Sequence, residues 1–303
     1  MNKEITGTLL AIIAAVVSGV SIPANKVFVV NIDPIVFTAV RAIIIGIVFL
    51  VLSLATNKNK KFFSVSWKYF ASIAIIGGAI AFALYFTGLK LTTAGRAAFL
   101  HKTLPLYTAL LAFAFLKEKI TKKYTIAIFV MFLGTIAIYS ASINPTDLWS
   151  NPQLGDMLVI SAAILWAVEN TIVKKAMKKG ETNFVVSFSR MFFGGLILFG
   201  AVILMGKTSV LMSFSMQQII NIAISTALLF AYVLFYYMSL KMINVSKATV
   251  LLLIAPVISL ILGIIFLREP APALQIAGSV IILVGAYLIT GMKSEQRSDY
   301  ARM

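Results

Sequence analysis

The sequence predicts an all-α membrane protein in which ten transmembrane helices form two inverted five-helix repeats. Its composition is the first indication, because 60% of the 303 residues are hydrophobic and only 12% are charged. Soluble domains average about 45–50% apolar and about 25% charged residues, so this few charges could not cover the surface of a soluble protein of this length. The other two indications are ten long apolar runs and a repeat of polar landmarks between the halves of the chain.

The ten apolar runs are each long enough to cross a bilayer. A helix needs about 20 apolar residues to span roughly 30 Å of hydrocarbon. The strands of an outer-membrane barrel would instead alternate apolar and polar residues, and these runs are apolar on all sides. The expected spans are 5–27, 34–55, 67–89, 93–116, 124–142, 155–175, 184–206, 216–240, 246–267 and 271–291.

The distribution of Lys and Arg predicts how the chain is oriented. With the N-terminus in the cytoplasm, 18 of these residues fall on the cytoplasmic side and five on the outer side. Cytoplasmic loops of membrane proteins carry this excess of positive charge. We therefore expect a multi-pass protein of the inner or plasma membrane with both termini in the cytoplasm. The net charge of +16 is explained by orientation in the lipid bilayer, so no nucleic-acid partner is expected.

The second half of the chain repeats the first. Shared hydrophobic composition does not explain polar landmarks that recur in the same order. The matches are separated by 151 residues for Tyr85 and Tyr236, Lys90 and Lys241, Arg96 and Lys247, Pro105 and Pro256, Glu118 and Glu269, and Gly134 and Gly285, and by 148 or 149 residues for Gly7 and Gly155 and for Arg41 and Arg190.

The repeat predicts two domains, 5–142 and 155–291, with five spans each. Because five is an odd number, the second domain must enter the membrane upside down relative to the first. Inverted repeats are typical of secondary transporters, whose substrate site lies near the midplane between the repeats. The sequence therefore predicts a transporter, while the repeat itself carries no information on the substrate.

These landmarks resemble those of the drug/metabolite transporter superfamily, in particular the EamA-type permeases with two copies of a five-helix module. The resemblance covers about 5–291 and rests on Pro105 with the Phe-Leu-Lys-Glu end of the fourth span and on Pro256 with the Phe-Leu-Arg-Glu end of the ninth. It implies a central cavity between the halves and export of amino acids or other metabolites. Some relatives carry sugar phosphates or nucleotide sugars. Four-helix relatives that expel cationic drugs use a Glu in their first span, and this chain has no acid there.

Four charged residues lie deep inside the expected spans. Each costs at least about 2.5–3.5 kcal/mol in the bilayer and should face protein or water. Lys102 is interpreted as a substrate or proton site in preference to a structural pair with Glu169. For Glu169 two interpretations stay open, an ion pair with Lys174 or a role in coupling. Arg41 and Arg190 are expected to tie their spans to neighbouring helix ends.

Aromatic, hydroxyl and amide side chains complete the candidates. Ser21 and Asn25 share one face of the first span, whereas Tyr236 and Tyr237 are expected in the interfacial belt. The only His, His101, is expected to be a packing residue, and with no Cys in the chain no metal or cofactor site is predicted. The substrate-binding candidates are Lys102, Trp166, Glu169, Tyr232, Tyr85, Ser21, Asn25 and Asn170, and the hinge candidates are Pro105, Pro256 and Pro23.

We interpret the chain as a secondary active exporter of small metabolites by alternating access, and not as an enzyme. A Lys among aromatic side chains suits a carboxylate or zwitterion, so amino acids or organic acids are the first substrates to consider. The sequence has no Gly-x-x-x-x-Gly-Lys-[Ser/Thr] motif, so ATP is not the energy source, and the resemblance favours coupling to protons.

Three alternatives to this function remain. A sugar-phosphate or nucleotide-sugar exchanger would need at least two cationic groups that converge on phosphate, and the sequence offers only Lys102. A membrane enzyme would need a catalytic constellation, which one His, one Glu within a span and no Cys do not supply. A lipid-scrambling role would not require charges within the spans.

Overall fold

The computed structural model describes residues 2–28, 32–56, 63–140, 143 and 146–294. In this part of the chain, ten helical segments are long and apolar enough to cross a membrane, which confirms the predicted number. Their ends lie within three residues of the predicted ones. In chain order they are α1 (Lys3–Phe28); α2 (Pro34–Thr56); α3 (Trp67–Ser72) with η1 (Ile73–Ile80) and α4 (Ala81–Leu91); α5 (Ala94–His101) with α6 (Leu104–Leu116); α7 (Lys122–Ser140); α9 (Leu154–Lys178); α10 (Asn183–Phe188) with η2 (Ser189–Phe193) and α11 (Gly194–Leu204); α13 (Met216–Met242); α14 (Val245–Leu251) with η3 (Leu252–Ile254) and α15 (Ala255–Leu267); and α16 (Ala273–Thr290).

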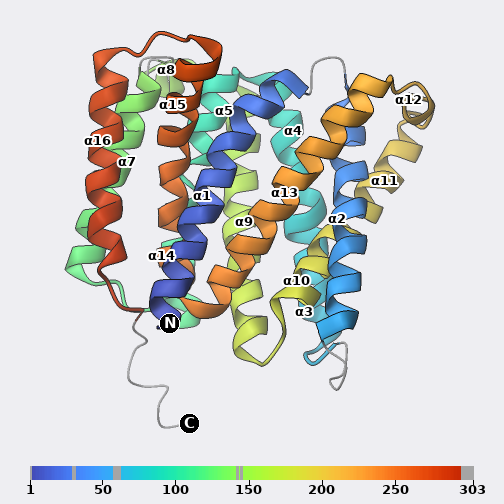
Figure 1. Ribbon diagram of the computed structural model, residues 1–303, viewed down its shortest axis with the longest axis horizontal. Helices are drawn as coiled ribbons and strands as arrows, with labels where there is room; N and C mark the ends of the chain where they lie inside the picture. The colour runs from blue at the N-terminus through green and yellow to red at the C-terminus, as the bar shows by residue number, and fades with distance from the viewer. Residues whose placement is uncertain (1, 29–31, 57–62, 141–142, 144–145, 295–303) are drawn as a thin grey trace.

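The helices run up and down through one layered bundle (Figure 1). The face where α1 begins and α16 ends is called the termini face, and the opposite face, which carries the short helix α8 (Asp147–Ser150), is called the α8 face. Another short helix, α12 (Ser209–Met212), lies on the connection between α11 and α13. Because each half crosses five times, the first half begins at the termini face and the second at the α8 face.

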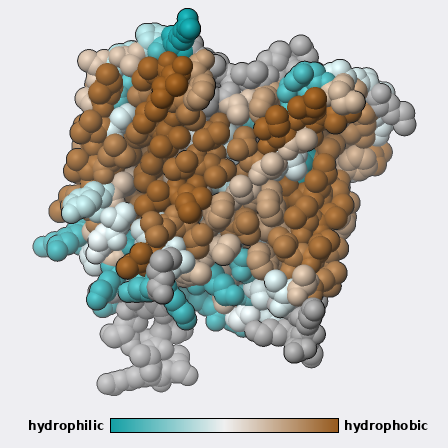
Figure 2. All heavy atoms as spheres, in the orientation of Figure 1, coloured by the Kyte–Doolittle hydropathy of each residue, from teal (hydrophilic) through white to brown (hydrophobic). Residues whose placement is uncertain are grey.

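The outer surface of the bundle matches a bilayer. Large apolar side chains are exposed along the middle of the helices, for example Leu110 at 65%, Phe129 at 61% and Ile265 at 62%. Figure 2 shows this apolar band across one side of the molecule, with hydrophilic side chains gathered toward its two ends. Apolar surface on this scale would be unstable in water and is stable against lipid chains.

Each repeat packs its first helix against helices of the other repeat. The first helix of the first repeat, α1, packs on α13 and α15 of the second, and the first helix of the second repeat, α9, packs on α4 and α6 of the first. The last helices of the two repeats, α7 and α16, pack together, where Gly134 and Gly278 let the two backbones approach so closely that a Cβ on either would collide with the other's carbonyl oxygen. The packing is therefore reciprocal, as a two-fold relation between repeats requires.

The backbone repeats as well. Within the described chain, only Lys117 and Arg268 are non-glycine residues with positive φ, at 57° and 53°. They are 151 residues apart, and each ends the second helix of a broken span, α6 or α15, in a left-handed C-cap. The two spans that contain Pro105 and Pro256 are therefore built alike, with a helix break followed by a second helix and a left-handed turn.

Candidate functional site

A cavity of about 250 Å³ lies inside the bundle, between the two repeats. This volume lies a little below the range of about 300–1,000 Å³ that is usual for small-molecule sites. Every span contributes to its wall except α7 and α16, the pair that packs at one edge of the bundle. We call it the central cavity; it is lined by Ser18, Ser21, Asn25, Arg41, Phe82, Tyr85, His101, Lys102, Leu104, Pro105, Trp166, Glu169, Asn170, Arg190, Met191, Leu229, Tyr232, Val233, Tyr236, Thr249, Leu252 and Leu253.

All eight substrate-binding candidates named from the sequence line the central cavity. Their role in binding stays a prediction, but they do share one site. Of the hinge candidates, Pro105 lines the cavity, Pro256 does not, and the side chain of Pro23 lies outside the described residues. Tyr236 and Tyr237 were expected in the interfacial belt, and this is wrong, because they are 1% and 0% exposed inside the bundle.

Lys102 sits at the break between α5 and α6. Its backbone N–H donates to the Phe99 carbonyl over 2.9 Å, the Thr103 hydroxyl donates to the Leu100 carbonyl over 2.6 Å, and Pro105 begins α6 without an N–H to satisfy. The Lys102 side chain is 7% exposed, and its ammonium group has no hydrogen-bond or ion-pair partner among the described residues. The central cavity is therefore the place where a polar partner can reach this buried ammonium group.

The equivalent break in the second repeat is apolar. Residues 151 positions after His101 and Lys102 are Leu252 and Leu253, which lie in the 3-10 turn η3. Both leucines line the same cavity. The two breaks therefore share their backbone geometry, but only the break of the first repeat carries a charged side chain.

Three aromatic rings from three different spans pack beside Lys102. The ring centroids of Tyr85, His101 and Trp166 lie 5.2 to 5.5 Å apart in each of the three pairs. The Phe82 ring lies 5.3 Å from that of Trp166, and the indole N–H donates to the Gly77 carbonyl over 3.1 Å. His101 was expected to be a packing residue; it packs in this cluster and also lines the cavity.

Glu169 is paired with Arg190, not with Lys102. The Tyr237 hydroxyl donates to Oε1 of Glu169, and Nη1 of Arg190 donates to the same hydroxyl over 2.9 Å. Nη1 of Arg190 also lies 3.9 Å from Oε2 of Glu169. The alternative pair with Lys174 is wrong as well, because Nζ of Lys174 donates to the carbonyls of Leu240 and Ile243.

Glycines in η1 bring this group together. A Cβ on Gly77 would collide with the side chain of Glu169, and a Cβ on Gly78 would collide with the backbone of Arg190 and Gly194. Small residues let membrane helices approach this closely. Both Arg190, in η2, and the two glycines, in η1, belong to π-helical segments, which are frequent at functional sites.

Arg41 is a second cation of the cavity without an acidic partner. Its side chain lies over the Phe37 ring, with 4.4 Å from Cζ to the ring centroid, and its buried Nε has no hydrogen-bond partner in the described part of the chain. Arg41 and Arg190, which were expected to tie their spans to neighbouring helix ends, both line the central cavity, and Arg190 contacts side chains of two other spans. The sequence offered a signal for their place in the cavity, because Arg41 and Arg190 are repeat mates that both lie inside expected spans.

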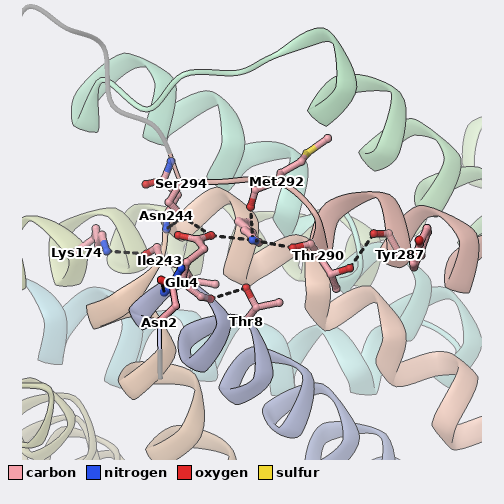
Figure 3. A network of polar contacts seen from close by, with 11 residues as sticks. Asn2, Glu4, Thr8, Lys174, Ile243, Asn244, Tyr287, Thr290, Met292 and Ser294 are labelled. Carbon is pink, nitrogen blue, oxygen red and sulfur yellow. Dashed lines mark hydrogen bonds and ion pairs between the residues drawn. The ribbon is translucent and has the colours of Figure 1, made fainter.

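The termini face is closed below the cavity by contacts between the repeats. The carboxylate of Glu118, which follows α6, accepts from the backbone N–H groups of Val245 and Ser246 over 2.9 and 3.2 Å and from the Ser246 hydroxyl. It therefore caps the N-terminus of α14. Figure 3 shows the neighbouring network around Glu4 and Ser294, in which Lys247 lies 2.7 Å from the Glu4 carboxylate. Glu118 had been noted only as a repeat landmark.

On the α8 face, Arg96 is paired with Asp156. Nε of Arg96 donates to Oδ1 of Asp156 over 3.2 Å, a second guanidinium nitrogen contacts Oδ2, and the Thr92 hydroxyl donates to Oδ1 over 2.6 Å. Lys247 is the repeat mate of Arg96, 151 residues later, and both pair with an acid of the other repeat; the partner of Lys247, Glu4, lies four residues before Thr8, the repeat mate of Asp156.

Nearby on the α8 face, Asp33 lies 2.6 Å from Nζ of Lys207. Burial raises the pKa of Asp33, but hydrogen bonds from Lys207 and from the N–H groups of Ile35 and Val36 outweigh it, so that the pKa lies below its ordinary value. This pair joins the start of α2 to the connection after α11 and lies outside the spans.

Residues 5–140 and 153–291 each match the model of the EamA-like transporter family. The chain is 26% identical over 291 residues to an uncharacterized transporter of Archaeoglobus fulgidus, covering 89% of this chain and 94% of that one. It is 25% identical over 213 residues to the uncharacterized transporter YyaM of Bacillus subtilis, covering 69% and 68%.

A solved crystal structure that is 19% identical superposes with a TM-score of 0.77 and covers 94% of this chain and 98% of that one; this likeness concerns the fold. No group of three His, Cys, Asp or Glu residues suited to a metal ion occurs in the described chain. Ten apolar helices, two repeats and two family matches agree: the chain is a multi-pass membrane protein that belongs to the EamA-like transporter family.

Proposed function

We propose that the chain is a secondary transporter that moves small organic acids or amino acids across the membrane by alternating access. The observation that carries this proposal is the central cavity, which is walled by both repeats and presents the ammonium group of Lys102 beside three aromatic rings. A substrate carboxylate at Lys102 would replace the water that the buried cation has lost. The names of the relatives and the family support transport over catalysis.

An asymmetry between the two faces supports alternating access. Glu118 is 0% exposed and caps α14 on the termini face, whereas its repeat mate Glu269 is exposed on the α8 face. The N-terminus of α5 is capped by its own Thr93, which accepts from the Arg96 N–H over 3.3 Å. In the second state of the cycle, Glu269 would cap α5 and Glu118 would be released. The cavity would then open to the termini face.

We further propose that the termini face is cytoplasmic and that transport is outward. The 18-to-5 distribution of Lys and Arg supports the first statement, and the resemblance to metabolite exporters supports the second. Because no native Cys is present, a single Cys at residue 147 tests the orientation: it should react from outside intact cells, and reaction only from the cytoplasm would contradict it.

Proton coupling is proposed at Glu169. It is the one carboxylate among the residues that line the cavity, and it is held between Tyr237 and Arg190, so a change in its protonation would alter contacts among three spans. Collapse of an imposed pH gradient on addition of substrate to proteoliposomes is the expected result. A Glu169→Gln variant should still exchange labelled for unlabelled substrate but should no longer move protons.

A sugar-phosphate exchanger is the second candidate function. From the sequence it lacked a second cation, and Arg41 and Arg190 now join Lys102 among the lining residues. Phosphate is bound best by several charged donors. Counterflow into liposomes loaded with amino acids, organic acids or sugar phosphates separates the two candidates.

Lys102→Met tests the site in the same counterflow assay. Transport should fall to background while the protein stays folded in detergent, because methionine preserves the apolar stem and removes the charge. Lys90→Met is the matched control, since Lys90 is exposed and does not line the cavity. Normal transport by a folded Lys102→Met variant would contradict the proposed site.

A further inference from the structure

We propose that the central cavity selects organic anions with a flat apolar body and excludes zwitterions and cations, with Arg41 and Lys102 as its two anion-binding groups. This inference rests on the proposed function and narrows its substrate class. The inference is drawn from which charged side chains of the cavity are already paired with each other. The sequence alone did not reveal this pairing.

The side chains that line the cavity carry more positive than negative charge. Four charged side chains line it, and two of these, Glu169 and Arg190, compensate each other through their ion pair and the shared Tyr237 hydroxyl. Arg41 and Lys102 remain, and neither has an ion-pair or hydrogen-bond partner for its side chain among the described residues. Both are less than 10% exposed. Two uncompensated cations around one cavity favour an anionic ligand, because a buried charge is stable only when it is paired.

The two cations lie at the same depth. Arg41 is the eighth residue from Pro34, where α2 leaves the α8 face, and Lys102 is the eighth residue from Gly95, where its span leaves the same face. At 1.5 Å per residue each lies about 10 Å along its helix from that face. Both charges therefore lie in one layer near the α8 face, whereas Glu169, the sixteenth residue of α9, lies about 22 Å along its helix from that face.

The body of the ligand would rest on the aromatic cluster. His101 precedes Lys102 in the chain, and the rings of Tyr85 and Trp166 pack on His101 with centroids 5.5 and 5.2 Å away. All three residues line the cavity beside the cations. Flat aromatic surface of this kind packs well against a ring or another planar group. A cavity of about 250 Å³ has room for one such group with its acidic substituent.

The state of Glu169 argues against a zwitterion. A substrate ammonium group would need an anionic partner, and Glu169 is the one carboxylate among the lining residues. Its Oε1 accepts from Tyr237, and its Oε2 lies 3.9 Å from Nη1 of Arg190 and has no hydrogen-bond partner among the described residues, but the side chain is 0% exposed and packs against Gly77, which keeps a ligand ammonium group away from it. An ammonium group in the layer of Arg41 and Lys102 would meet two like charges instead. The same argument excludes cationic ligands.

The test uses three probes that share one ring and differ in charge. These are 3-phenylpropanoate, phenylalanine and 2-phenylethylamine, added to the purified full-length protein in detergent, with the dissociation constant measured by titration calorimetry. We expect 3-phenylpropanoate to bind at least about tenfold more tightly than phenylalanine and the amine not to bind. Equal or tighter binding of phenylalanine or of the amine, or no binding of any probe at millimolar concentration, would overturn the inference.

Variants assign the charge selectivity to the two cations. Arg41→Gln and Lys102→Met should each weaken 3-phenylpropanoate binding by about tenfold or more, and Lys90→Met should leave it unchanged. Arg41→Lys, which keeps the charge, should retain most of the binding and covers the case in which Arg41→Gln does not fold. Unchanged binding in both neutral variants would overturn the assignment.

Transport separates this inference from the proposed function. Counterflow of phenylalanine as fast as that of 3-phenylpropanoate would overturn the anion selectivity and leave the transporter proposal standing. Absence of counterflow for every organic acid, amino acid and sugar phosphate tested would contradict the transporter proposal itself.

Discussion

Glu118 on the termini face and Glu269 on the α8 face occupy the same place in the two repeats but have different surroundings. Each follows a left-handed residue, Lys117 or Arg268, with φ of 57° and 53°, so the local backbone turns in the same way at both. Glu118 nevertheless is fully buried and caps the helix α14, while Glu269 is exposed. Equivalent sequences with equivalent local geometry thus differ only in how the two halves meet.

Under the proposed alternating access, this difference belongs to one conformation of the molecule and is reversed in the other. The residues that would receive Glu269 in the inverted arrangement are 94 and 95, which are 151 positions before Val245 and Ser246. The N-cap position that Asn244 holds in α14 without a side-chain cap bond is held by a bonded Thr93 in α5. The cap of α14 on the termini face therefore comes from the other repeat, whereas the cap of α5 on the α8 face comes from its own repeat.

The largest expected effect concerns the ion pairs formed by the repeat mates Arg96 and Lys247. Arg96→Met should lower the free energy of unfolding by about 3–5 kcal/mol, because it leaves a buried carboxylate unpaired; the side chains of Arg96 and Asp156 are only 8% and 7% exposed. Lys247→Met should cost less, about 1–3 kcal/mol, because the side chain of its partner Glu4 is 21% exposed to water. Unfolding in mixed detergent micelles measures both.

Adding Asp156→Asn to Arg96→Met should recover part of the loss, since the unpaired charge is then gone. Equal losses for Arg96→Met and Lys247→Met would mean that burial does not distinguish the two faces. The free energies of unfolding of these two variants would then reveal no difference between the two faces.

The next effect compares the two glutamates directly. Glu118→Ala should lower the free energy of unfolding by about 1–3 kcal/mol, because the N–H groups of Val245 and Ser246 lose a buried acceptor. Glu269→Ala should change it by less than about 0.5 kcal/mol, as is usual for exposed positions. A larger loss for Glu269→Ala than for Glu118→Ala would contradict the assignment of the sealed face.

The smallest effect is the pH dependence of the pair Asp33–Lys207. The pKa of Asp33 is lowered in the folded state, so the pair stabilises the protein above the ordinary pKa near 3.8, and this contribution is lost as the pH falls through the lowered value. Lys207→Met should cost less than about 1 kcal/mol at pH 7. The difference between wild type and variant should vanish on acidification. A difference that grows below pH 4 would contradict this account.

The spans and the repeat were predictable because hydropathy and polar landmarks are properties of the chain read in order. The positions of individual side chains in the assembled bundle were less predictable. Arg190 looked like an interfacial residue by counting along its span, but it lies in the π-helical segment η2, which changes the direction of side chains relative to an α-helix. Tyr237 lies near the end of α13, yet it is buried where α10 and α9 pack on that helix, and its hydroxyl binds Arg190 and Glu169.

The sequence also did not predict which charged side chains of the cavity pair with each other. Lys102 and Glu169 have opposite signs and lie in neighbouring layers, so a pair between them was a reasonable hypothesis. The approach of η1 to α9 and α11, which Gly77 and Gly78 allow, instead brings Arg190 to Glu169. Close contacts between glycines depend on which helix faces meet, and this is fixed only by the assembled bundle.

The central claim is that the two repeats exchange their seals during transport, and cysteine pairs test it most directly because the chain has no native Cys. A short bifunctional thiol reagent should join Glu118→Cys to Ser246→Cys in the resting protein, where the side chains of Glu118 and Ser246 are in contact. The same reagent should join the equivalent pair, Gly95→Cys and Glu269→Cys, only while a transported substrate is present. Either link should stop counterflow, and reduction should restore it. Equal linking of the second pair with and without substrate, or full transport by a linked protein, would contradict the exchange of seals.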